Sequence, residues 1–141
     1  MISHETLAHC AESEVLACSF HGEDAVVKHR PKKAYRHPTL DTKIREGRTV
    51  REARALVRAK KAGVPTPAVY HVDKATCSIV MERVRGSTVR DVIAAEEPSS
   101  PLVRAFLRSM GDCIARLHSG DQIHGDLTTS NFLLRDPTDP S

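Results

Sequence analysis

The sequence has few aromatic residues and no long apolar run. Aromatic residues make up 4% of its 141 residues and tryptophan is absent, so a hydrophobic core has to be mostly aliphatic. The longest apolar runs, such as Val15–Cys18, have four residues, whereas a membrane-spanning helix needs about 20. We therefore expect no membrane association. The length suits one compact domain with a real core.

Cysteine is also scarce and widely spaced. The four cysteines form no C-x-x-C pair, and no Cys/His cluster has the spacing of a zinc site. The first residues, MISHETLAHC, include acids and no apolar stretch, unlike a secretory signal. These features predict four reduced thiols in a protein of the cytoplasm and nucleus, and no zinc site.

Charge is distributed unevenly, although the net charge is only +3. Thirteen Lys or Arg residues and three acids lie between Val26 and Lys61, whereas the rest of the chain carries eight basic and 15 acidic residues. Such a block either faces phosphates or an acidic partner, or forms the solvated side of a helix. Charge alone does not decide between these interpretations.

Short β-favouring segments predict a small antiparallel sheet. Glu14–Phe20 and Asp24–Arg30 flank a short turn at His21-Gly22-Glu23, which indicates a hairpin. Ala68–Asp73 and Cys77–Val84 predict two further strands after an intervening helical region.

That helical region is expected to begin at Thr49. Thr49 and Glu52 fit a capping box, with Thr49 as the N-cap and Glu52 reaching back to it. Gly63 supplies the C-cap. Upstream, Pro38 disfavours a continuous helix, although one helical turn over Leu40–Arg45 is expected.

The C-terminal half is expected to be mainly helical. Thr88–Glu96 predicts a short helix, and the apolar periodicity of Leu102–Leu117 predicts a longer amphipathic one ending near Gly120. A strand over Phe132–Leu134 follows. The order of elements predicts an α+β fold with a sheet-containing part, then a helical part, and a seam around residues 82–86.

One polar motif could carry chemistry. IHGDLTTSNFLL places His124, Asp126 and Asn131 on one short segment. Phosphoryl transfer needs a carboxylate that aligns the attacking hydroxyl and, a few residues later, an oxygen that ligates magnesium. The same residues also suit an ordinary Asx-turn before a strand, so the motif alone leaves both interpretations open.

Upstream residues favour the chemical interpretation. Lys28 ends an apolar strand segment, as the phosphate-binding lysine of kinases does. Such a lysine needs a carboxylate from the next helix, and Glu52 lies in that helix. Glu52 would pair with Lys28 only if the helix begins before Thr49; otherwise it caps with Thr49. The segment Ile79–Gly86 changes from apolar to polar and reaches Gly, as a hinge between two lobes would.

Taken together, these segments resemble one kinase family. AVVKHR, YRHPTLD, RTVREARAL, MERVRG, IARLH and IHGDLTTSN are similar to the PRPK family, the small atypical kinase/ATPase of the KEOPS (EKC) complex. The resemblance runs from about Cys10 to Leu134. It implies a protein-kinase-like fold, with an N-lobe at 1–81, a hinge at 82–86 and an incomplete helical C-lobe at 87–141.

The resemblance also implies roles for individual residues. Asp126 and Lys28 would be catalytic, with Asp126 as the base and Lys28 on the α/β-phosphates, oriented by Glu52. Asn131 would ligate Mg²⁺. Contacts to ATP would include the hinge residues Met81 and Glu82. The segment that replaces the glycine-rich loop would add Cys10, Ala11, Glu12, Ser13 and Val15.

The sequence departs from kinases at Gly125, which replaces the Arg of the common His-Arg-Asp motif, and in two other places. The segment Cys10–Val15 contains no glycine, and a Cβ hinders close approach of the backbone to phosphates. No Asp-Phe-Gly follows Asn131, so the principal magnesium ligand of kinases is missing and we expect a truncated kinase.

Three functions follow as expectations. The first is an ATP-dependent serine/threonine kinase or ATPase that supports threonylcarbamoyl-adenosine modification of tRNA, acting with other KEOPS subunits, especially the tRNA-modifying ATPase-fold subunit. The second is an inactive scaffold or tRNA-binding module that uses the basic segment 26–61. The third is a small-molecule phosphotransferase, since such enzymes also use an H-G-D-x-x-x-x-N loop.

Overall fold

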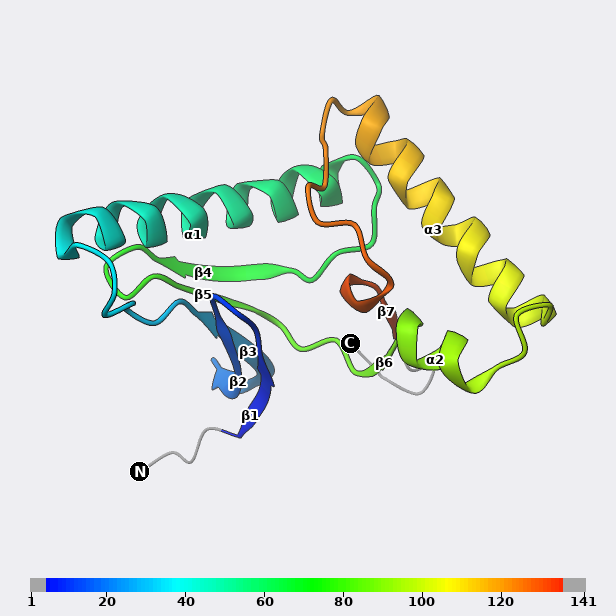
Figure 1. The fold of residues 1–141 in the computed structure, drawn as a ribbon, viewed down its shortest axis with the longest axis horizontal. Helices are drawn as coiled ribbons and strands as arrows, with labels where there is room; N and C mark the ends of the chain where they lie inside the picture. The colour runs from blue at the N-terminus through cyan, green and yellow to red at the C-terminus, as the bar shows by residue number, and fades with distance from the viewer. Residues whose placement is uncertain (1–4, 136–141) are drawn as a thin grey trace. The chain divides into compact units, whose positions relative to one another are not determined.

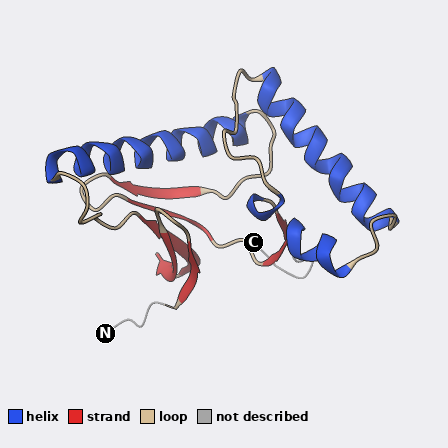
Figure 2. Cartoon of the chain, in the orientation of Figure 1, coloured by secondary structure: helices blue, strands red, loops and turns tan. Residues whose placement is uncertain are grey.

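The computed structural model describes residues 5–135, which fall into two compact units (Figure 1). The first unit extends to Arg58 and includes Thr66–Arg83; the second comprises Ala59–Pro65 and the chain from Val84 onward. Figure 2 shows strands and helices in both parts of the chain, so the predicted α+β class is confirmed. No helix among residues 5–135 is long and apolar enough to cross a membrane.

The first unit is built on a five-stranded antiparallel sheet. Its strand order is β1-β2-β3-β5-β4. The strands are β1 (Thr6–His9), β2 (Glu14–Phe20), β3 (Glu23–His29), β4 (Val69–Asp73) and β5 (Ser78–Glu82). The four predicted strands are present, whereas β1 is an addition that the polar N-terminal sequence did not predict.

The hairpin of β2 and β3 places Lys28 in the middle of the sheet. His21 and Gly22 connect the strands with φ values of 52° and 90°, as a type I′ turn requires. The resulting register sets Lys28 opposite Val15 on β2 and opposite Ile79 on β5. The predicted hairpin and its turn are therefore confirmed.

Helix α1 (Pro38–Lys61) begins well before the predicted start. Pro38 is tolerated in the first turn, where a backbone N–H would lack an intrahelical partner anyway. Thr49 is fully buried inside the helix, and its hydroxyl donates to the Arg45 carbonyl at 2.9 Å. The prediction of Thr49 as N-cap was wrong because its T-x-x-E pattern lies within a continuing helix.

The end of α1 was predicted correctly. Gly63 follows the helix with a φ of 77°, a conformation that glycine adopts without a Cβ penalty. Its N–H donates to the Lys60 carbonyl at 3.0 Å, and the Val64 N–H donates to the Ala59 carbonyl at 3.0 Å. These two bonds form a Schellman motif and satisfy carbonyls at the helix end.

An aliphatic core joins α1 to the sheet. Ala53 of α1 packs with Ile79 and Met81 of β5, all 7% exposed or less. Partly buried side chains complete this cluster, namely Val26, Leu56 and Val69. Figure 1 shows α1 running alongside β4 and β5, in agreement with these contacts.

A buried ion pair supports the first half of α1. Asp41 is 3% exposed, and its Oδ2 accepts from Arg45 Nε at 2.7 Å one turn later. Arg36 Nη1 lies 3.6 Å from Asp41 Oδ1. Burial alone would raise the pKa of Asp41, but the hydrogen bond and positive charge of Arg45 outweigh it and lower that pKa.

The second unit contains α2 (Val89–Ala95) and α3 (Pro101–Ser119), as predicted. Thr88 and Ser100 cap these helices through their side chains. A short sheet pairs β6 (Gly86–Thr88) with β7 (Leu133–Arg135). Its core combines Leu117 and Cys113 of α3 with Ala59, in the last turn of α1, and Val64, which follows that helix.

We predict that Ile79→Ala destabilises the chain by about 2–5 kcal/mol, because it removes buried methyl groups and leaves a cavity against α1. Urea unfolding followed by circular dichroism measures the change. Val72→Ala on β4 is the control, since Val72 is 37% exposed and should cost much less. Equal losses for the two variants would contradict the proposed position of the core.

We also predict that the contribution of Asp41 to stability depends on acid pH. A carboxyl whose pKa is lowered by folding stabilises the native state above its unfolded pKa, near 3.9, and loses that effect as pH falls through the folded value. The difference in unfolding free energy between the parent and Asp41→Asn should be constant above about pH 5 and shrink below about pH 4. Urea titrations across this range test it; a difference that grows in acid would contradict it.

Candidate functional site

The central interaction of the first unit joins Lys28 to Glu52. Lys28 Nζ donates to Glu52 Oε1 at 2.5 Å, across 24 residues of sequence. Both side chains are half-buried, at 27% and 23% exposed. Because α1 begins at Pro38, Glu52 is not needed for a cap at Thr49. The alternative in which Glu52 pairs with Lys28 is therefore the one that the structure adopts.

Arg30 shares the same carboxylate, a contact that the sequence reasoning missed. Its Nη2 donates to Glu52 Oε2 at 2.6 Å. Lys28 lies near the end of β3 and Arg30 directly follows the strand, two residues later; side chains at this spacing point to the same face of an extended chain. That spacing was the available signal. Glu52 is consequently held by two cations, one on each oxygen.

The β1–β2 loop (Cys10–Ser13) lies in the segment that was predicted to replace the glycine-rich loop of kinases. It is a tight turn in which the Cys10 N–H donates to the Ser13 carbonyl at 2.8 Å, and Ser13 is buried. None of its four residues has a positive φ. The turn therefore does not need glycine, which explains how CAES can form it. Val15, just beyond the loop, lies opposite Lys28.

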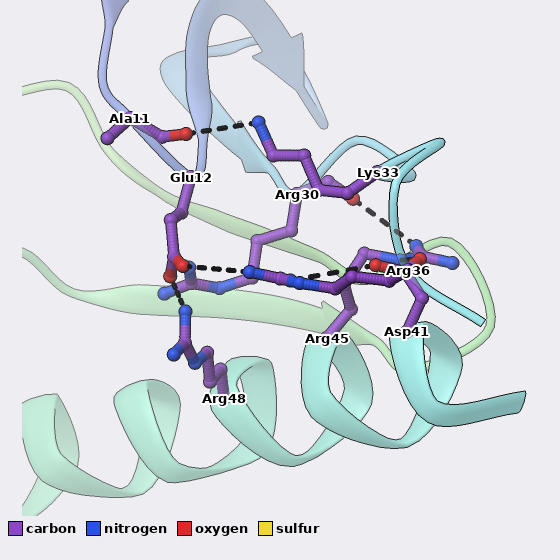
Figure 3. A network of polar contacts seen from close by, with 8 residues as sticks. All are labelled: Ala11, Glu12, Arg30, Lys33, Arg36, Asp41, Arg45 and Arg48. Carbon is purple, nitrogen blue, oxygen red and sulfur yellow. Dashed lines mark hydrogen bonds and ion pairs between the residues drawn. The ribbon is translucent and has the colours of Figure 1, made fainter. Parts of the chain in front are cut away.

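The side chain of Glu12 points toward α1 and its preceding segment, as Figure 3 shows. Glu12 Oε1 accepts from Arg36 Nη2 at 3.2 Å, and Glu12 Oε2 forms an ion pair with Arg48. Lys33 Nζ donates to the Ala11 carbonyl at 3.0 Å. The loop is thus attached to the helix side of the unit by three cationic side chains.

The predicted hinge begins where β5 ends. Met81 is 7% exposed and lies opposite Val26 of β3. The Glu82 N–H donates to the Ala68 carbonyl at 2.8 Å, while Glu82 Oε2 accepts from the Ala68 N–H at 2.9 Å. The backbone N–H and the side chain of Glu82 are therefore both hydrogen-bonded to Ala68 of the same unit. The roles of Met81 and Glu82 toward adenine remain predictions.

In the second unit, Asp126 and Asn131 lie together in one exposed loop. Asn131 Nδ2 donates to the Asp126 carbonyl at 2.8 Å and to Asp126 Oδ2 at 3.2 Å. The Asp126 N–H donates to His124 Nδ1 at 3.3 Å, so His124 restrains the backbone of this loop. A 3₁₀ turn, Thr129–Asn131, brings the amide back toward the carboxylate. The five-residue spacing therefore produces a real juxtaposition.

This pair offers oxygens of the kind that Mg²⁺ prefers. Both of these bonds use the Nδ2 donor of Asn131, so they do not occupy its Oδ1 acceptor. Mg²⁺ is usually held by one or two such protein oxygens together with substrate phosphates and water. Among residues 5–135 no cluster of three or more His, Cys, Asp or Glu residues could hold a metal alone. The pair fits a cation that binds with a phosphate ligand.

Comparisons with known proteins agree with this kinase-like arrangement. The family model of the lipopolysaccharide kinase (Kdo/WaaP) family matches residues 19–140. The EKC/KEOPS complex subunit Tp53rkb of Mus musculus is 47% identical over 131 residues, which cover 90% of this chain and 54% of the relative. The EKC/KEOPS complex subunit bud32 of Dictyostelium discoideum is 38% identical, with 91% and 52% covered.

A longer relative is a probable bifunctional tRNA threonylcarbamoyladenosine biosynthesis protein of Methanobrevibacter smithii. It is 43% identical over 92% of this chain, which covers 22% of the relative. The chain spans about half the length of the two curated KEOPS subunits that it matches. The resemblance to the PRPK-type subunits is confirmed by these relatives, and the chain belongs to the lipopolysaccharide kinase (Kdo/WaaP) family.

Proposed function

We propose that this chain is the ATP-binding part of a KEOPS-type atypical serine/threonine kinase or ATPase, which transfers the γ-phosphate of ATP to a hydroxyl or to water. The observation that carries the proposal is the Asp126–Asn131 contact within an H-G-D-x-x-x-x-N loop. The Lys28–Glu52 pair supports it, because kinases use such a pair to hold phosphates.

In this mechanism Lys28 contacts the α/β-phosphates of ATP. Glu52 and the β3 backbone hold its ammonium group in place, so that little side-chain entropy is lost when phosphates bind. Arg30 neutralises the second oxygen of Glu52. The carboxylate therefore adds no unpaired negative charge beside the phosphates.

Asp126 acts as the base that aligns the attacking oxygen and accepts its proton. Asn131 restrains the Asp126 carboxylate through Nδ2 and would hold Mg²⁺ through Oδ1. Negative charge on the transferred phosphoryl group is neutralised by Mg²⁺ when bound. Both residues are exposed, so this loop is open to a substrate.

The relatives named above make tRNA threonylcarbamoyl-adenosine modification the proposed context. The chain would act with other KEOPS subunits, including the tRNA-modifying ATPase-fold subunit, in the cytoplasm and nucleus. The basic segment 26–61 is less available to tRNA than its charge suggested. At least five of its cations pair with carboxylates in the first unit, namely Lys28, Arg30, Arg36, Arg45 and Arg48.

We predict that Asp126→Asn lowers ATP turnover by about 10²–10⁴-fold, because the amide cannot accept a proton. Release of labelled γ-phosphate is measured for the purified chain, alone and with KEOPS-type partner subunits. Asp121→Asn is the matched control, since Asp121 is an exposed acid in the preceding turn. Turnover that survives Asp126→Asn, or a parent without turnover in either setting, would overturn the proposal.

We predict non-additive effects for Lys28→Met and Glu52→Gln. Each single change should weaken ATP binding. Lys28→Met removes the ammonium group, and Glu52→Gln removes the carboxylate that positions it. The double variant should bind ATP about as weakly as Lys28→Met, since residues in direct contact act as a unit. Fluorescent-ATP titration of the four proteins measures this coupling. Fully additive losses would show that Glu52 does not act through Lys28.

A further inference from the structure

Glu12 lines a small hollow between the β1–β2 loop and the start of α1. The other charged side chains that line it are cationic: Arg30, Lys33, Arg36, Arg45 and Arg48 (Figure 3). Glu12 binds two of these cations, one on each carboxylate oxygen. It is thus the one acid, among the residues lining the hollow, that matches this positive charge.

These contacts attach the loop to the helix that carries Glu52. Arg48 and Glu52 are four residues apart in α1, so they lie on the same helix face. Glu52 holds Lys28 of β3, while Arg48 holds Glu12 of the loop. The β1–β2 loop and Lys28 are therefore both held by ion pairs to the same turn of α1.

The loop needs such an external restraint because it has few of its own. Ala11 is exposed, and one backbone bond, from Cys10 to Ser13, closes the turn. A free Glu12 carboxylate in this position would also repel phosphates that approach the loop. The two arginines draw it toward α1 and compensate its charge.

We propose that Glu12 is a positioning residue for phosphate binding, which fixes the β1–β2 loop against Arg36 and Arg48 of the α1 side. The proposal rests on the proposed function, since it assigns the loop to the phosphates of ATP. In this proposal the Glu12 side chain acts through Arg36 and Arg48, in place of the direct contact to ATP that the sequence predicted. It acts by keeping the loop in the conformation that is competent to bind.

The first test measures loop order without nucleotide. Hydrogen–deuterium exchange of the amides of residues 10–13 should accelerate in Glu12→Gln and to a smaller extent in Arg48→Met, which leaves the Arg36 contact in place. Glu46→Gln is the matched control, because it removes from the same helix an ion pair, Glu46–Lys74, that includes neither Glu12 nor its two arginines. Unchanged exchange in Glu12→Gln would overturn the proposal.

The second test compares binding of ATP with that of adenosine. Glu12→Gln should weaken ATP binding about tenfold, since affinity falls with the fraction of competent loop, and leave adenosine binding unchanged. Glu12→Asp, which keeps the charge, should restore part of the loss, and Glu12→Gln/Arg48→Met should be no worse than Glu12→Gln. A purely structural role would weaken both ligands equally and overturn the proposal.

The two failures can be told apart. If the parent chain binds neither ligand, the proposed function fails. Faster exchange in Glu12→Gln would then show only that Glu12 makes a structural contact, and the positioning role would fail as well. If the parent binds ATP but Glu12→Gln binds it equally well, the positioning role alone is wrong.

Discussion

The carboxylate of Glu52 is the point on which the arrangement of the first unit depends. It bridges helix α1 and strand β3 by accepting from Lys28 on one oxygen and from Arg30 on the other. A half-buried charge is stable when it is paired and hydrogen-bonded, and both conditions hold here. The packing of Ala53 against Ile79 and Met81 places the helix where this bridge can form.

In the rest of that unit, a few carboxylates pair with many basic side chains. Only three acids lie between Val26 and Lys61, and Glu12 comes from outside it. Glu12, Asp41 and Glu52 each contact two cations, so each carboxylate joins two segments of chain. A basic block that could have been a uniform solvated face is partly used for internal structure. This sharing links the β1–β2 loop, the segment before α1 and the sheet.

Local signals predicted much of the fold. The His21-Gly22 turn, the Gly63 C-cap and the amphipathic periodicity of α3 each depend on residues close in sequence, and each was confirmed. The start of α1 was mispredicted because a T-x-x-E pattern inside a helix is locally the same as one that caps the start of a helix. Strand β1 was missed because its pairing with β2, rather than its own composition, makes it a strand.

The sequence by itself determined the Asp126–Asn131 pair, because a short loop with a 3₁₀ turn brings residues five apart into contact. It also indicated Lys28 and Glu52 as partners but left a capping role for Glu52 open. Tertiary structure decided that choice, since the continuous helix from Pro38 removes the need for a cap at Thr49. It alone revealed Arg30 on Glu52 and Arg36 and Arg48 on Glu12, because ion pairs across more than 20 residues depend on how helix and sheet pack.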